Sequence, residues 1–519
     1  MDKRSAEPKE FQRLRVRWNY LLDEDPAQAL KEARETSSNL SPRGEVHARI
    51  KASILIDAGA AAGDTKAIQD GIALFEELLS RFPKDPVCHY NLGNGFLALA
   101  DRQPYTGSDW FLDTADLRQK ARRQFLLATS FDSTEVISSQ AFTNLGNAFW
   151  KAHRWVEAYD AYTKALEHDR TNGVALTGAA KVLLHCVQHR IGNPKILRSV
   201  AGRHLKSAQQ HSDKIRELIG SQAYKDLTKL FPQITDAETR YNLTHASDYE
   251  KFVARHRLAL SPTITGLDCS LKRWDSLRIR SLTESISSHS GVPALIAMFN
   301  ALKSDFLAAR YLAHLAFSEC FPDRGLYSDT LDYAVYGVTT SILSLAQRAS
   351  IDVLDKIAVA TSEYLAIPSE TLVYFSNRWF DANNAQPRQW HPSLLPEIHA
   401  GNTALIALAE LSLDVMRGGA LHQKKAYRDA STHRFTVLHD IGCKPSRPST
   451  YIEHCGIAEF KSQLVESLQL ARAAILYFVE MISIRETLNK PTAGQVGVLE
   501  VPTHQWIRGT GEEVSSHPR

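Results

Sequence analysis

Apolar residues recur every three or four positions through four long stretches in the second half of the chain. These stretches lie at 292–317, 336–365, 405–416 and 460–484. Such spacing places the apolar residues on one face of an α-helix. The alternation of apolar and polar residues that indicates a half-buried strand is nearly absent. The pattern therefore predicts an all-α protein whose second half is a helical bundle.

The first half carries a repeated run of four residues, Asn-Leu-Gly-Asn, at 91–94 and again at 144–147. Small and bulky residues accompany both runs at spacings typical of two packed antiparallel helices. They are Leu92, Gly93, Phe96, Ala121, Phe125 and Ala128 in one copy, and Phe142, Leu145, Gly146, Phe149, Ala158, Tyr162 and Ala165 in the other. Small residues let the helices approach closely, and large ones fill the remaining space. The first of these copies has an insertion, which we place at 101–116.

Weaker copies flank these two, one over 55–83 and one beginning near Val174. The register resembles that of the tetratricopeptide repeat (TPR), which implies a helical solenoid with a concave groove for a protein or peptide partner. We expect the segment 26–36 to form a capping helix, because Pro26 is suited to a first helical turn.

Composition and charge narrow the function classes. Hydrophobic residues make up 44% of the 519 residues, which is typical of a folded globular protein. Lys and Arg number 61 against 58 Asp and Glu, a formal charge of +3. Any RNA contact should therefore depend on a local basic patch rather than on bulk charge.

The cysteines and the N-terminal segment bear on the cellular compartment in which we expect the protein. The six cysteines include no CxxC pair and match no disulfide or zinc spacing, so we expect free thiols and no metal or other cofactor. The charged segment 1–17 lacks the apolar core of a signal peptide. No unbroken run of about 18 apolar residues occurs, so we expect a cytoplasmic protein without membrane contact.

Candidate chemistry lies at 427–434, Tyr-Arg-Asp-Ala-Ser-Thr-His-Arg. Four residues separate Arg428 from His433, and a polar residue, Asp429, follows the arginine. Treated as one helix through Leu438, the segment would turn these three side chains away from a core face. Taken alone, an arginine and a histidine on a helix are usually solvated surface residues.

A second match to this spacing, Arg434 to His439, ranks below the first because Phe435 replaces the polar residue after the arginine. Three other runs accompany the first match: Leu-Ala-Leu-Ser-Pro at 258–262, Met-Phe-Asn-Ala-Leu-Lys at 298–303 and Leu-Asp-Lys-Ile-Ala at 354–358. Together with the R-x4-H spacing, they resemble the HEPN ribonucleases, in particular the bacterial branch fused to TPRs, over roughly 250–488.

The resemblance implies metal-independent cleavage of RNA. The ribose 2′-OH would attack the adjacent phosphate and leave a 2′,3′-cyclic phosphate and a free 5′-OH. His433 would act as general base or acid, and Arg428 would hold the phosphate and stabilise charge on its oxygens. Asp429 would orient His433 or a substrate group. HEPN proteins commonly pair two motif helices, which implies a homodimer with a composite active site.

The resemblance leaves alternatives open. HEPN proteins of this kind commonly act in phage defence or toxin–antitoxin conflict, which implies a latent effector whose solenoid senses a partner. The alternative is a TPR adaptor whose helical domain dimerises without cutting RNA. A third possibility is a two-gene system in which a nucleotidyltransferase modifies the domain.

The patterns divide the chain into four parts. The predicted parts are a TPR-like solenoid at 1–190, a helical connector at 191–255, a HEPN-like bundle at 256–488 and a flexible tail at 489–519.

Overall fold

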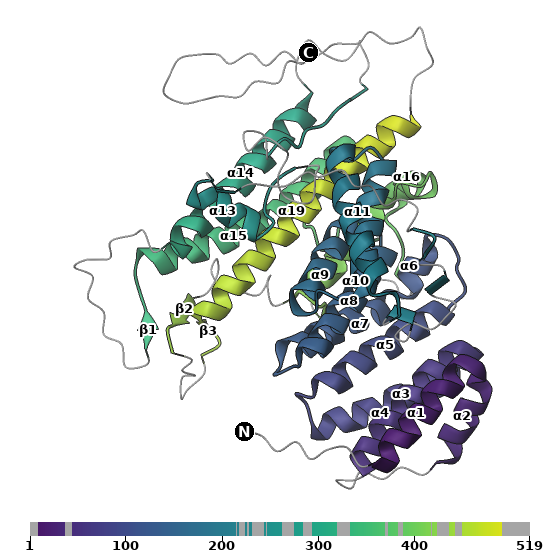
Figure 1. Cartoon of the computed structure of the whole chain (residues 1–519). Helices are drawn as coiled ribbons and strands as arrows, with labels where there is room; N and C mark the ends of the chain where they lie inside the picture. The colour runs from purple at the N-terminus through teal and green to yellow at the C-terminus, as the bar shows by residue number, and fades with distance from the viewer. Residues whose placement is uncertain are drawn as a thin grey trace.

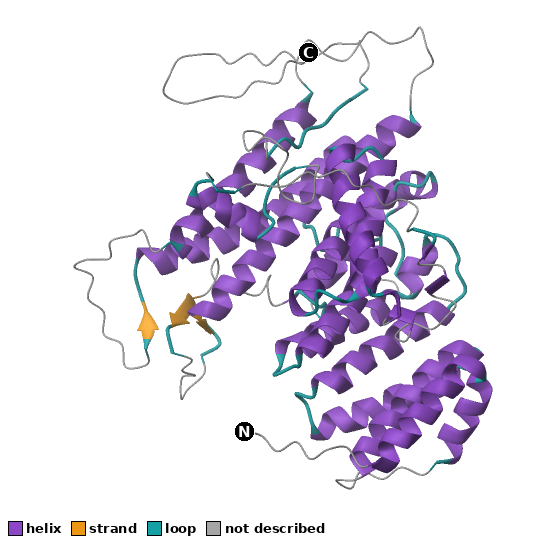
Figure 2. Ribbon diagram, viewed as in Figure 1, coloured by secondary structure: helices purple, strands orange, loops and turns teal. Residues whose placement is uncertain are grey.

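The computed structural model describes most of the chain. The described residues are 9–36, 44–213, 215–216, 224–225, 228–230, 243–244, 246–261, 275–283, 293–318, 333–368, 372–381, 388–416, 418–422, 435–441 and 449–489. Within them the protein is built almost entirely of helices, with a small sheet at one end of the C-terminal half (Figures 1 and 2). The all-α prediction is confirmed.

The N-terminal half is a stack of helix pairs. Consecutive pairs α3–α4, α5–α7, α8–α9 and α10–α11 pack side by side (Figure 1). The bounds are α1 Lys9–Glu24, α2 Pro26–Glu35, α3 Gly44–Ala62, α4 Thr65–Arg81, α5 Pro86–Arg102, α7 Ala115–Ser130, α8 Glu135–Lys151, α9 Trp155–His168, α10 Gly173–Gln188 and α11 Pro194–Gln210. The expected capping helix is α2, which begins at Pro26. The preceding residue, Asp25, caps its N-terminus, because the Asp25 side chain accepts a hydrogen bond from the Gln28 backbone N–H. The stacking of pairs continues through α11, beyond residue 190.

The glycines of the repeats permit the close helix contacts that the sequence predicts. A Cβ placed on Gly93 would lie 2.6 Å from the Phe125 ring, and one on Gly146 would lie 2.6 Å from the Tyr162 ring. A third glycine, Gly178 on α10, lies against the same tyrosine, with a hypothetical Cβ only 2.5 Å from its ring. Only a residue without a side chain leaves room for these aromatic rings.

The predicted insertion contains a short helix, α6 (Asp109–Asp113), between α5 and α7. Trp110 and Phe111 are buried there, and the Arg118 guanidinium lies 4.7 Å from the centre of the Trp110 ring. Ser108 accepts a hydrogen bond from Trp390 Nε1 of the C-terminal half at 3.3 Å. The insertion therefore contributes to the contact between the two halves.

The four amphipathic stretches of the second half form the four long helices of a bundle, as predicted. These are α14 (Ala294–Phe317), α15 (Val338–Tyr364), α17 (Thr403–Val415) and α19 (Ile457–Leu488). Helix α19 packs against the other three and also against α9 of the solenoid (Figure 1). Shorter elements complete the bundle: α13 (Asp248–Arg255), the 3-10 turn η3 (Pro392–Leu394) and α16 (Leu395–His399).

Helix α19 is long and apolar enough to cross a membrane by length and composition. The sequence-based expectation had considered only unbroken apolar runs, and α19 contains charged residues such as Glu466 and Arg472. However, 72% of its most apolar stretch of 18 residues is buried inside the structure. Its apolar character is explained by packing on several sides in the core of the bundle.

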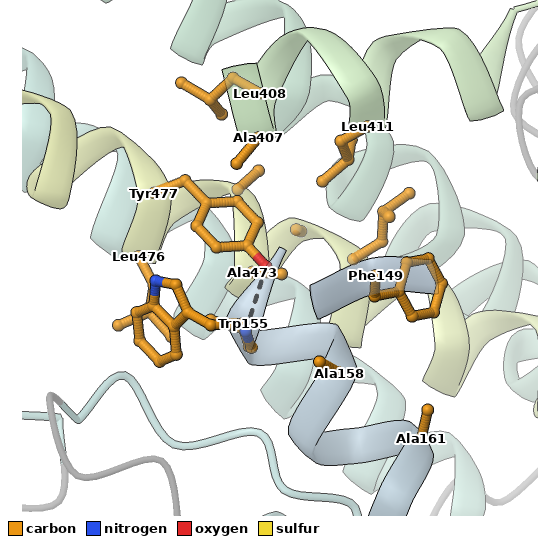
Figure 3. Close-up of a cluster of buried hydrophobic side chains, with 14 of the residues drawn as sticks. Phe149, Trp155, Ala158, Ala161, Ala407, Leu408, Leu411, Ala473, Leu476 and Tyr477 are labelled. Atoms are coloured by element: carbon orange, nitrogen blue, oxygen red, sulfur yellow. Dashed lines mark hydrogen bonds between the residues drawn. The ribbon is translucent and has the colours of Figure 1, made fainter. Parts of the chain in front are cut away.

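The two halves share one continuous hydrophobic core. Figure 3 shows Trp155 of α9 and Tyr477 of α19 in contact, with Leu408 and Leu411 of α17 nearby. Tyr477 Oη accepts a hydrogen bond from the Val156 backbone N–H at 3.1 Å. The solenoid therefore packs directly onto the bundle helices.

The bundle also carries a three-stranded sheet, in the order β1 (Ala334–Val335), β2 (Phe435–His439) and β3 (Ile452–Gly456). Strands β1 and β2 are antiparallel, whereas β2 and β3 are parallel. The expectation of a helix through Leu438 is wrong for the residues from Phe435 onward. Phenylalanine, threonine and valine suit a pleated strand, and pairing with β3, distant in sequence, decides the conformation.

Candidate active site

The predicted site residues Arg428, Asp429 and His433 all fall in 423–434, which lies outside the described residues. The structure therefore describes the two flanks of this segment. Helix α17 precedes it, and strand β2 begins two residues after His433. Both flanks are held by contacts that join distant parts of the chain.

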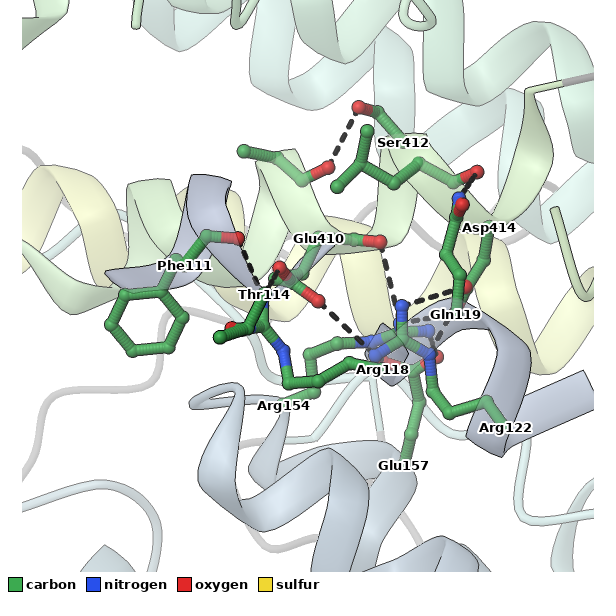
Figure 4. Close-up of polar contacts among 12 residues, drawn as sticks. Phe111, Thr114, Arg118, Gln119, Arg122, Arg154, Glu157, Glu410, Ser412 and Asp414 are labelled. Atoms are coloured by element: carbon green, nitrogen blue, oxygen red, sulfur yellow. Dashed lines mark hydrogen bonds and ion pairs between the residues drawn. The ribbon is translucent and has the colours of Figure 1, made fainter. Parts of the chain in front are cut away.

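The first flank, α17, is anchored by buried charges. Its carboxylates Glu410 and Asp414 lie one helical turn apart and face three arginines of the solenoid (Figure 4). Arg122 pairs with Asp414 at 2.8 Å and with Glu410 at 3.1 Å. Arg118 also pairs with Glu410, and Arg154 with Asp414. All five side chains are at most 1% exposed.

These pairs favour the ionised form of the Asp414 carboxylate. Burial alone would raise the pKa of Asp414, but the nearby guanidinium groups of Arg122 and Arg154 outweigh it and lower the pKa below its ordinary value. The backbone oxygen of Asp414 also accepts a hydrogen bond from the Leu421 N–H at 2.8 Å. The chain that leaves α17 toward residue 423 therefore starts from an anchored position.

The second flank is the pair of parallel strands. Phe435 lies opposite Ile452, Val437 opposite His454, and Leu438 opposite Cys455. Leu438 and Cys455 are buried, and both strands contact α19. Side chains of a strand alternate between its two faces, so Phe435, Val437 and His454 share the other face. Phe435 is 70% exposed at the end nearest His433.

Two histidines meet on this sheet. His439 Nε2 and His454 Nδ1 are 2.8 Å apart, and their ring centres are 5.0 Å apart. His439 is only 1% exposed, whereas His454 is partly exposed. A hydrogen bond between two imidazole nitrogens requires that one of them carries the proton and the other accepts it. The pair therefore restricts the tautomers of both rings.

The sequence reading missed this pair, although a signal was present. His454 follows Arg447 at R-x6-H spacing, within the range of the HEPN motif, but Pro448 takes the place of the polar residue. His439 ends the lower-ranked match from Arg434. Such spacings are common in a chain with 20 histidines. The contact across two strands distinguishes these two histidines, and it depends on tertiary structure.

A metal site needs several ligating side chains close together in space. Among the described residues, no three His, Cys, Asp or Glu side chains converge in a way that could hold a metal ion. The His439–His454 pair supplies two nitrogens, already hydrogen-bonded to each other. Imidazole nitrogens of this kind can donate or accept a proton.

Comparison with known families identifies the C-terminal half. Residues 286–485 match the family model described as LA2681-like HEPN. The matched segment extends from just before α14 into α19 and includes all three strands, the predicted residues at 428–433 and the histidine pair. This part of the chain is a HEPN domain, so the inferred resemblance to HEPN domains is confirmed for these residues.

No curated protein matches the chain. The chain joins a helical N-terminal half, built of stacked helix pairs, to a C-terminal HEPN domain that is similar to the LA2681-like family model.

Proposed function

We propose that this protein is a metal-independent endoribonuclease of the HEPN type. Its 2′-OH attack chemistry would leave a 2′,3′-cyclic phosphate and a free 5′-OH. The observation that supports the proposal is the HEPN match over 286–485, because this segment contains the Arg428–His433 spacing. HEPN domains commonly act as nucleases, which makes this activity the one that the match favours.

The proposed roles follow from side-chain chemistry. His433 exchanges a proton with the substrate, since its ordinary pKa lies near neutral pH. Arg428 binds the phosphate with its planar set of donors and stabilises the charge that develops there. Asp429 orients His433 or a substrate group. A homodimer would bring two copies of these residues to one composite site.

The biological setting is part of the same proposal. A cytoplasmic effector of antiviral defence or toxin–antitoxin conflict must remain latent until a trigger arrives. A protein or peptide bound to the stacked helix pairs could supply that trigger. The buried charges between the solenoid and α17 support this arrangement, because they connect the N-terminal half to the helix that precedes the candidate residues.

A cleavage assay tests the proposal. Purified full-length protein is incubated with total bacterial RNA in excess EDTA, and the chemistry of the RNA ends is determined. Wild type should produce 2′,3′-cyclic phosphate ends, and His433→Ala should be slower by at least ~100-fold. The exposed His399 on α16 provides a matched control, and His399→Ala should cleave like wild type.

Two results would contradict the proposal in different ways. Equal cleavage by His433→Ala and wild type would show that the site assignment is wrong. The absence of EDTA-resistant cleavage by wild type would favour a non-catalytic adaptor with a dimerising HEPN domain.

A further inference from the structure

The sheet at the end of the bundle, where α19 begins, has an open edge (Figure 1). Among the described residues, β3 has a neighbouring strand on one side only, because the strand order is β1, β2, β3. The Phe435 N–H donates to the Tyr451 carbonyl oxygen at 2.9 Å, which sets the direction of the backbone groups of β3. These directions alternate along a strand, so Glu453 also faces β2. The N–H and C=O groups of Ile452 and His454 therefore point away from the sheet.

These outward groups are available to another strand. Within the described part of the chain, no hydrogen bond reaches the backbone of Ile452 or His454 from the open side. An unpaired edge of this kind is a template for strand addition. Many proteins block such an edge with lysine, proline or a bulge. Strand β3, Ile-Glu-His-Cys-Gly, has neither residue, and its register with β2 is continuous.

The direction of these groups fits a second copy of β3. About a two-fold axis at His454, two copies of the strand run antiparallel, and each His454 N–H donates to the carbonyl oxygen of its counterpart. Ile452 then lies opposite Gly456 of the second copy, whose N–H has the same outward direction. The Gly456 N–H donates to the Ile452 carbonyl oxygen, and the same bond forms in the other direction. One register thus uses the outward groups of all three residues.

The side chains of β3 also fit this partner. Glu453 is the one carboxylate of the strand, and in this register it faces Cys455 of the second copy, so like charges do not lie opposite each other. Tyr451, which precedes the strand, is 71% exposed. It would lie beside the start of the second copy's α19, which begins at Ile457. A large exposed side chain at a sheet edge is typical of an interaction surface.

We propose that two copies of this chain join through the open edge of β3, so that their sheets form one continuous sheet with a two-fold axis at His454. The proposed function expects a homodimer but assigns no surface to it. This inference assigns the surface, and it rests on the proposed function only for the expectation of two copies.

A cysteine at the two-fold axis tests the register. Opposite residues of a hydrogen-bonded antiparallel pair have Cα atoms about 5.5 Å apart, within the range of roughly 4.4–6.8 Å that a disulfide spans. Under mild oxidation, full-length His454→Cys should therefore form a covalent dimer. Tyr451→Cys is the matched control, because its two copies would lie about 20 Å apart and should not cross-link. Wild type measures the background from the six native cysteines.

A second pair of variants serves if His454→Cys does not fold. A Cβ at Gly456 has nothing within 4 Å, so Gly456→Cys should be tolerated. Ile452→Cys mixed with Gly456→Cys should give a covalent dimer, whereas either protein alone should not. Thermal unfolding of each variant checks the fold.

Blocking the edge tests the interface without a cross-link. The Ile452 N–H points out of the sheet, and an edge strand tolerates proline at such a position. In the paired strands, proline removes a donor and its ring keeps the second copy away. Sedimentation equilibrium should show a dimer for wild type and for Ile452→Val. For Ile452→Pro, the dissociation constant should rise by at least ~10-fold.

The contrary outcomes are distinct. A monomeric wild type would overturn the inference and leave the edge to a strand of a different protein. A dimer that Ile452→Pro leaves intact, or equal cross-linking by His454→Cys and Tyr451→Cys, would mean that the copies join through another surface. These measurements use no RNA. A failed cleavage assay would therefore overturn the proposed function and leave this interface standing.

Discussion

At the residue scale, Glu480 of α19 is a carboxyl group in a largely apolar setting. Burial raises its pKa to about 7, and the hydrogen bond from Trp155 Nε1 at 2.6 Å only partly offsets this effect. The group lies where the solenoid meets the bundle. Its protonation therefore affects the stability of that contact.

We predict that the free energy of unfolding falls less with rising pH in Glu480→Gln than in wild type. The folded-state pKa is raised above the ordinary value of 4.5. The stabilising contribution is therefore fully present below pH 4.5 and is lost as the pH rises to about 7. Glutamine has no such proton and can still accept the Trp155 hydrogen bond. Relative to the variant, wild type should lose up to about 3 kcal/mol of unfolding free energy across this window.

Urea unfolding at pH 5 and pH 8 measures the effect. The exposed Glu459 on the same helix provides the control, since Glu459→Gln should leave the wild-type pH dependence unchanged. An identical pH dependence for wild type and Glu480→Gln would show that this carboxyl group is already ionised in the folded protein.

At the element scale, Tyr162 determines how three helices of the solenoid meet. Its ring lies between Gly146 of α8 and Gly178 of α10, and its hydroxyl donates to Asn147 Oδ1 at 2.7 Å. The hydrogen bond limits how far the ring can move. The Tyr162 ring therefore packs against the backbone of both glycines, because neither has a side chain in its way.

We predict that Gly146→Ala destabilises the protein by about 1–2 kcal/mol. Alanine would stabilise the helix by up to about 1 kcal/mol through its higher helix propensity. However, its Cβ would lie 2.6 Å from the Tyr162 ring. Such overpacking typically costs about 1–3 kcal/mol or more. Thermal unfolding should show the decrease. Gly456→Ala is the matched control because a Cβ there has nothing within 4 Å. A Gly146 variant more stable than wild type would contradict the packing argument.

At the scale of the whole molecule, the buried charges on α17 connect two halves that are far apart in sequence. Arg122 and Asp414 are separated by 292 positions. A buried ion pair is weak evidence for stability by itself, because desolvation offsets much of the attraction. Removing one partner of such a pair is strongly destabilising, because the other charge stays buried without an opposite charge beside it.

We predict that Asp414→Ala lowers the free energy of unfolding by about 3–5 kcal/mol, because Arg122 and Arg154 then lose their shared carboxylate. Lys151→Ala breaks an exposed pair with Asp101 and should change stability by less than about 1 kcal/mol. Chemical denaturation of the full chain measures both. Equal effects from the two variants would mean that solvent reaches the buried cluster.

Local patterns in the sequence predicted most of the helices, because helical periodicity depends on residues three and four positions apart. The bundle helices α14, α15, α17 and α19, the close contacts of Gly93 and Gly146, and the HEPN resemblance are examples. The roles of Arg428, Asp429 and His433 stay predictions.

Other features were decided only by tertiary structure. Strand β2 replaced an expected helix because its partner β3 begins more than ten residues later and stabilises an extended chain. The His439–His454 contact depends on the register of these parallel strands. The arginines of the solenoid find their carboxylates on α17 only when the halves are packed together. Such pairings are long-range, and a local pattern of polar and apolar residues carries no information about which distant segments will meet.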